Sequence, residues 1–107
     1  MVDIFTTRVL SLGSVIQLQG SFQKLLVIAR ALNVSNEGKQ YFFDYGGVPY
    51  PDGLTGDQIA YFNRDQVARV IFEGYRDDDD AIVVDNIKRY EQENPQLQRF
   101  RLPRAGA

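Results

Sequence analysis

The chain has 107 residues, 12 of them Lys or Arg and 14 Asp or Glu, with neither His nor Cys. A chain of this length forms one domain. The missing residue types exclude a Ser-His-Asp triad, a thiolate nucleophile, a Cys/His zinc site and disulfides. The formal net charge of −2 provides no overall field that would attract a nucleic-acid backbone. Composition therefore excludes His- and Cys-based chemistry and leaves open whether carboxylates act in its place.

The apolar runs of the chain are short. The longest clean run, residues 25–29, is far below the roughly 20 residues that span a bilayer. The first residues carry Asp3 and no long apolar core, so they do not read as a secretory signal. We expect a cytoplasmic protein with no membrane partner.

Alternating apolar residues predict antiparallel strands in the first half of the chain. Residues 12–18 read as a half-buried strand, and residues 24–30 (KLLVIAR), apolar at both parities, as a central strand covered on both faces. A turn over residues 33–39 leads into a third strand, residues 40–45. Its odd positions share one face and are all aromatic: Tyr41, Phe43 and Tyr45.

Residues 46–60 contain four Gly and two Pro, which predict a long loop without a regular element. Long loops of this kind in small domains often carry function. The loop and its neighbours supply the candidate interaction surface: Tyr45, Val48, Tyr50, Asp52, Leu54 and Tyr61.

A short helix and a fourth strand follow. Asn63 is placed to cap a helix of at least residues 64–67, with Gln66 at the capping-box position and Phe62 spaced to pack on Val67. Residues 68–75 read as a strand. Its alternation puts Val70 and Phe72 on one face, and Ile71 and Tyr75 on the other.

The last expected element is a helix over residues 78–93, with acids in its first turn and a stop at Pro95. Its apolar stripe is either a lid on the core or the surface of a homodimer or partner complex: Val83, Val84, Ile87 and Tyr90. The globular domain is then 1–94. The basic residues 95–107 are expected to fray as a flexible tail.

Three sets of residues could have a chemical role instead of a purely structural one. Residues 77–80 could hold a hard cation, although they are better explained as a helix start. Asp44, Asp52 and Asp57 could form an acid/base pair, although the last two stand in ordinary turn contexts. The dense aromatic residues could stack nucleic-acid bases, although few basic residues accompany them.

Four segments, LSLGSVIQLQG, KLLVIAR, DYGGVPYPDG and FNRDQVARVIFEGYRDDDD, occur in this order. Together they resemble the small bacterial domain-of-unknown-function family 4176 over about residues 10–85. The most specific pieces are YPDG at 50–53 and FEGY at 72–75, the latter followed by acids. The chain departs from the family in having Val9, not Pro, before Leu10, and in its Arg-rich tail.

The resemblance implies which genes lie beside the gene of this protein, and it implies little about chemistry. Such proteins are commonly encoded in Gram-positive bacteria beside type VII secretion loci and their LXG-type toxins. This implies an accessory, chaperone-like or immunity-like binding role in the cytoplasm, with a secreted toxin or its accessory proteins as partner. It implies no catalytic residue, metal or cofactor.

The expected fold is α+β and mainly β. Four to five antiparallel strands form a partly open, SH3-like barrel or strongly bent sheet, with one C-terminal helix. The leading hypothesis is a non-enzymatic protein-interaction module. A small-barrel nucleic-acid-binding module is the alternative, and a carboxylate- or metal-dependent hydrolase is the third.

Overall fold

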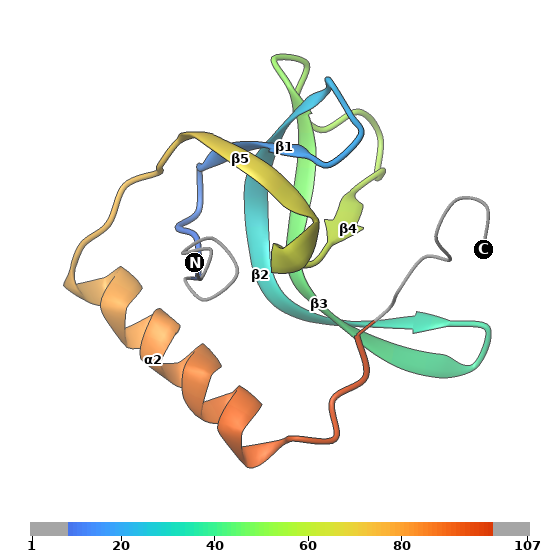
Figure 1. The fold of residues 1–107 in the computed structure, drawn as a ribbon, viewed down its shortest axis with the longest axis vertical. Coiled ribbons are helices and arrows are strands. Elements are labelled where there is room, and N and C mark those ends of the chain that lie inside the picture. Colours follow the sequence, from blue (N-terminus) through green and yellow to red (C-terminus); the bar gives the residue numbers. More distant parts are fainter. Residues whose placement is uncertain (1–8, 100–107) are drawn as a thin grey trace.

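The computed structural model describes residues 9–99. Five strands form one antiparallel sheet in the order β4-β3-β2-β1-β5, with a helix beside it (Figure 1). The expected fold class is confirmed. The elements are β1 Val15–Leu18, β2 Lys24–Asn36, β3 Lys39–Tyr50, β4 Ala60–Phe62, the 3₁₀ turn η1 Arg64–Gln66, β5 Val67–Phe72 and α2 Asp78–Glu93.

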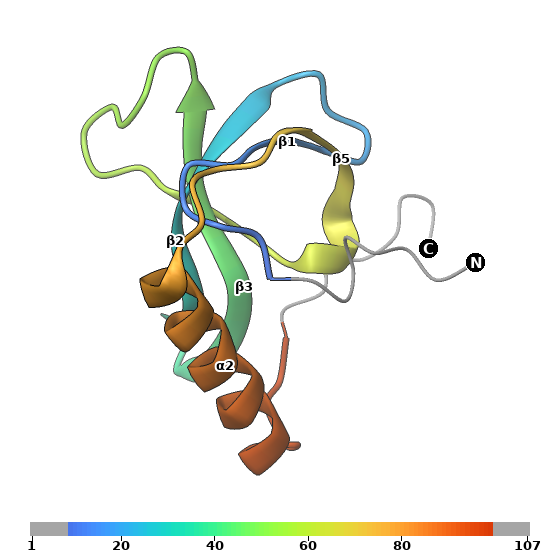
Figure 2. The same cartoon turned by 90° about the vertical axis from the view of Figure 1, so that its left-hand side faces the viewer.

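The sheet must be strongly bent, because β4 and β5 lie at its opposite edges and yet only residues 63–66 join them. Four strand spacings would separate the edges of a flat sheet by about 19 Å. The Cα atoms of Phe62 and Val67, five positions apart, can lie at most about 18 Å from each other. The 3₁₀ turn between them shortens this reach, because it rises only about 2 Å per residue. The edges therefore curl toward each other (Figure 2).

β2 and β3 form one long hairpin whose pairing runs from Lys24↔Tyr50 to Asn36↔Lys39. The turn is only Glu37 and Gly38, both with positive φ (52° and 80°), as in a type I′ turn. The predicted turn over residues 33–39 was therefore too long. The hairpin continues well past the predicted third strand.

The predicted loop over residues 46–60 is wrong at its start, because residues 46–50 belong to β3. The two glycines there serve close packing. A Cβ on Gly47 would lie 3.0 Å from the carbonyl oxygen of Leu26 and 3.2 Å from the ring of Phe62. The connecting loop is residues 51–59, between β3 and β4.

One face of β2 is buried and the other is more open, and the strand becomes irregular at Ile28. The pairing with β3 shifts between Val27 and Ala29, which leaves Ile28 as the extra residue of a β-bulge. Leu25 and Val27 are buried, whereas Ile28 is 38% exposed. The prediction that this strand is covered on both faces is wrong.

A second irregularity changes the faces of β5. Val70 pairs with Ile16 and Phe72 with Val15, so Ile71 is the extra residue. Val70 packs against the core, and Phe72 is 60% exposed. The predicted shared face of Val70 and Phe72 is therefore wrong, because a bulge reverses the alternation that the prediction assumed.

The buried core lies inside the curled sheet: Leu10, Ile16, Leu25, Val27, Tyr45, Phe62 and Val67. Phe62 and Val67 belong to this cluster on either side of η1, as their spacing predicted. The backbone N–H of Asn63 donates to the side chain of Gln66 at 2.8 Å, which confirms the predicted capping-box hydrogen bond. The helical turn is nevertheless shorter than predicted, ending at Gln66.

The predicted bounds of α2 are confirmed, with Asp77 as N-cap accepting from the backbone N–H of Asp80 at 3.0 Å. Ile87 is its buried residue, whereas Val83 and Tyr90 remain 41% and 38% exposed. Part of the predicted stripe therefore stays open to solvent.

The chain after α2 returns to the sheet. The backbone N–H of Phe42 donates to the carbonyl oxygen of Gln98 at 2.8 Å, and Arg99 forms a parallel bridge with Phe42. The guanidinium of Arg99 also lies 5.0 Å from the centre of the Phe42 ring. The expected fraying is wrong for residues 95–99. Residues 1–8 of the predicted domain and 100–107 of the predicted tail lie outside the described residues.

Two segments far apart in the sequence meet at a tight seam. The hydroxyl of Ser11 donates to the carbonyl oxygen of Gly74 at 2.9 Å, and the N–H of Gly74 donates to Ser14 at 3.0 Å. Any Cβ on Gly74 would collide with the carbonyl group of Leu12. The LSLGS and FEGY segments are therefore the two halves of one backbone contact, which we call the seam.

Replacing Gly74 tests the seam. We expect Gly74→Ala to lower the free energy of unfolding by about 3 kcal/mol or more, because the colliding atoms are backbone and cannot turn away. Gly38→Ala is the control. Gly38 has a φ of 80° and open space around it, so only the backbone conformation is penalised, at about 1 kcal/mol. Urea unfolding measures both, and equal losses would contradict the seam.

Candidate interaction surfaces

Two of the predicted surface residues lie in the interior. Tyr45 is 0% and Val48 3% exposed. The Tyr45 hydroxyl accepts a hydrogen bond from the backbone N–H of Leu10 at 2.9 Å, and burial raises its pKa. Both side chains support the fold and offer no area to a partner, which corrects their assignment to the interaction surface.

The other four predicted residues are exposed, and two of them, Tyr50 and Tyr61, line different hollows. Tyr50, Leu54 and Tyr61 are 46%, 55% and 43% exposed, and Asp52 lies exposed in the loop after β3. The ring of Tyr61 packs 5.5 Å from that of Phe43, in a separate hollow at the β2–β3 hairpin. Tyr50 borders a different hollow.

That hollow has a volume of about 470 Å³, and we call it the outer hollow. It forms because the bulge in β5 turns Phe72 into register with Val15, which pairs in turn with Leu26 of β2. Tyr50 pairs with Lys24 at its edge. Its lining is almost entirely apolar: Gly13, Val15, Lys24, Leu26, Tyr50, Ile71 and Phe72.

The sequence predicted one residue of the outer hollow, Tyr50, but not Ile71 and Phe72 of β5. Strict alternation puts Ile71 and Phe72 on opposite faces, whereas both line the hollow. The β-bulge that turns them together depends on the partner strand. No local pattern in residues 68–75 could have signalled it.

A network of four charges joins the end of α2 to the sheet. Asp44 and Glu91 each accept from both Arg64 and Arg99, at distances between 2.6 and 3.0 Å. The side chain of Asp44 is only 1% exposed. This network fixes the last turn of α2 and the segment that follows it.

The network assigns Asp44 a structural role. Burial by itself would raise the pKa of Asp44, but hydrogen bonds from Arg99 and Arg64 outweigh burial and lower it below 3.8. A carboxyl group in this state is a poor general acid near neutral pH. Asp52 and Asp57 are exposed in the loop before β4.

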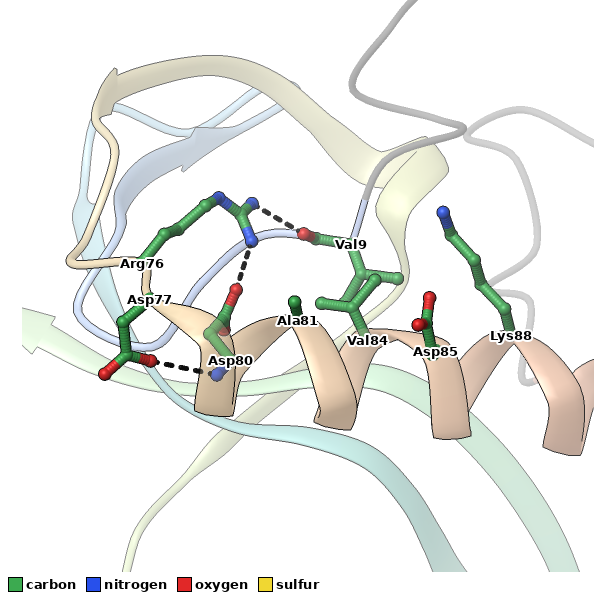
Figure 3. A pocket seen from close by; sticks show the side chains of 8 residues that line it. All are labelled: Val9, Arg76, Asp77, Asp80, Ala81, Val84, Asp85 and Lys88. Atoms are coloured by element: carbon green, nitrogen blue, oxygen red, sulfur yellow. Dashed lines mark hydrogen bonds and ion pairs between the residues drawn. The ribbon is translucent and has the colours of Figure 1, made fainter.

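A groove of about 310 Å³ lies along the start of α2 (Figure 3). Asp80 accepts from Arg30 and from Arg76 at 2.7 Å each, and Arg76 also donates to the carbonyl oxygen of Val9 at 2.7 Å. Ala81, Val84 and Val9 form its apolar wall, with Asp85 and Lys88 at the far end.

These contacts bear on the predicted cation site at residues 77–80. Asp77 caps α2, and Asp80 is held by two arginines, so both carboxylates already have partners. Within residues 9–99 no group of three or more acidic side chains is suited to hold a metal ion. The observed contacts therefore support the structural role of residues 77–80 at the start of α2.

The model of one protein family, described as Domain of unknown function (DUF4176), matches residues 9–83. The chain belongs to this family. The DUF4176 match includes both halves of the seam, all five strands and the first turn of α2. No curated protein and no solved structure matches the chain.

The DUF4176 segment contains Asp44 and Arg64 of the charge network, whereas Glu91 and Arg99 lie beyond it. It also contains every residue that lines the outer hollow. No helix within residues 9–99 is long and apolar enough to cross a membrane.

Neutralising Asp44 tests the charge network. We expect Asp44→Asn to lower the free energy of unfolding by about 3 kcal/mol at pH 7, because two partly buried arginines lose their shared carboxylate. The lowered pKa of Asp44 means that its contribution is present above pH 3.8 and is lost as the pH falls through the folded-state pKa. The variant should therefore lose less stability than the wild type between pH 5 and pH 2.

Asp52→Asn is the matched control, because Asp52 is exposed in the loop after β3. It should leave the unfolding free energy within about 0.5 kcal/mol of the wild-type value. Chemical denaturation across this pH range measures both variants. If Asp44→Asn behaves like the control, the network does not stabilise the fold.

Proposed function

We propose that this protein is a non-enzymatic protein-interaction module whose partner packs into the outer hollow. The supporting observation is the exposure of two large aromatic side chains there, Phe72 at 60% and Tyr50 at 46%. Apolar area that is left open in this way marks an interaction site in many small soluble domains. Aromatic residues are also enriched where protein partners bind.

The lining of the outer hollow favours a protein partner over a nucleic acid. Lys24 is the one charged residue among the seven that line it. Binding of single-stranded nucleic acid combines stacking with a positively charged groove that follows the backbone. One lysine on a chain of net charge −2 supplies little of that second component.

A finer proposal concerns the partner. We propose an LXG-type toxin of a type VII secretion system, with this protein as its cytoplasmic accessory, chaperone-like or immunity-like partner. The support is the resemblance of the chain to a family commonly encoded beside such toxins, together with membership of the DUF4176 family. An apolar hollow with aromatic edges agrees with a chaperone-like role, because it could cover apolar surface on a toxin before export.

The test is co-purification with an LXG-type toxin co-expressed from the same operon, with the tag on the toxin. We expect the wild type to be retained and Phe72→Lys to be reduced about 30-fold in affinity, as for the loss of a central aromatic contact. Tyr50→Ala should weaken retention less. Thermal melting of each variant confirms that the fold survives.

Phe22→Lys is the matched control, because Phe22 is 96% exposed and does not line the outer hollow. It makes the same substitution and should retain the toxin at the wild-type level. Wild-type retention by Phe72→Lys would reject the outer hollow as the binding surface. Failure of the wild-type protein to retain any such toxin would reject the finer proposal.

A further inference from the structure

A second hollow, of about 420 Å³, also borders the seam. Leu12 and Tyr75 line it, whereas Gly13 and Phe72, from the same two segments, line the outer hollow. Its remaining lining comes from the start of α2 and from β2. We call it the acidic hollow, and it is lined by Leu12, Arg30, Tyr75, Asp77, Asp79, Asp80 and Val83.

The floor of the acidic hollow is apolar and open. Leu12 is 48%, Tyr75 80% and Val83 41% exposed. Ile82, which precedes Val83 on α2 and lies outside the lining of the hollow, is 60% exposed. Large apolar side chains from a turn, a loop and a helix thus converge without covering one another, which gives a partner side chain room to pack.

The rim of the acidic hollow is negative. Three carboxylates and one guanidinium line it, and the guanidinium of Arg30 is already bound to Asp80 at 2.7 Å with 7% of its side chain exposed. Asp77 and Asp79 are exposed. The N-terminus of a helix contributes only about half a positive charge, so these two carboxylates outweigh it.

We propose that the acidic hollow docks a basic, apolar segment of a protein partner, in which Lys or Arg stands next to large aliphatic side chains. The apolar floor packs against the aliphatic part, and the exposed carboxylate of Asp79 binds the cation. Asp77, which caps α2, adds to the negative charge of the rim. Complementary charge of this kind steers association and selects the partner. This site is independent of the outer hollow, since the two share no residue.

The probe is a fourteen-residue peptide of leucine and lysine at helical spacing, titrated into the full chain while backbone amide shifts are followed by NMR. We expect the shifts to centre on Leu12, Tyr75 and Val83. Asp79→Lys should weaken binding about tenfold, and Tyr75→Ala about fivefold. Raising the salt from about 50 to 200 mM should weaken wild-type binding, because the charges are exposed and screened. The same peptide with glutamate for lysine should not bind.

Asp57→Lys is the matched control, because it makes the same charge change in the exposed loop before β4. It should alter affinity less than twofold. If Asp57→Lys weakens peptide binding as much as Asp79→Lys does, the peptide is attracted to the net charge alone and the proposal is overturned. Amide shifts centred on the outer hollow would overturn it too. Analytical ultracentrifugation without peptide tests whether two copies of this chain form a dimer through the acidic hollow. A dimer that Asp79→Lys dissociates would assign the hollow to a second copy of this chain, and would also overturn the proposal.

Discussion

The backbone contact between Gly74 and the turn at Leu12 is the constraint on which the rest of this structure depends. Ser11 and Ser14 bind both polar backbone atoms of Gly74, and no side chain fits between the two segments. The contact joins the end of β5 to the start of β1 and holds the two segments at a fixed distance. Leu12 and Tyr75 of these segments line the acidic hollow, and Gly13 and Phe72 line the outer hollow, so the same contact shapes both candidate surfaces.

The helix is attached to this sheet largely by charge. Ile87 is the residue of α2 that is buried, while Asp80 at one end and Glu91 at the other are each held by two arginines. Partly buried ion pairs need their geometry to be kept, because a carboxylate without its arginines is costly in the interior. This mode of attachment leaves apolar area on the flank of α2, including Val83, available to a partner.

The strands, the cap at Asp77 and the bounds of α2 could be predicted because each depends on neighbours in the sequence. The candidate surface could be predicted only in part. Tyr50 does border an open hollow, but Tyr45 belongs to the buried core, and Val48 is buried because β3 runs five residues further than predicted. Two adjacent glycines usually indicate a loop, whereas at Gly47 the missing side chain allows the backbone of Leu26 to approach.

Three properties of this small acidic domain follow from its sequence without a structure: it has no His or Cys chemistry, it is mainly β, and its acids at 77–80 begin a helix. Composition and short-range periodicity decide those properties. Only the tertiary structure decided that Asp44 meets Arg99, 55 residues away, and that Ile71 and Phe72 face the same hollow. Ion pairing across the chain and the placing of a β-bulge depend on the register of neighbouring strands, which no local pattern encodes.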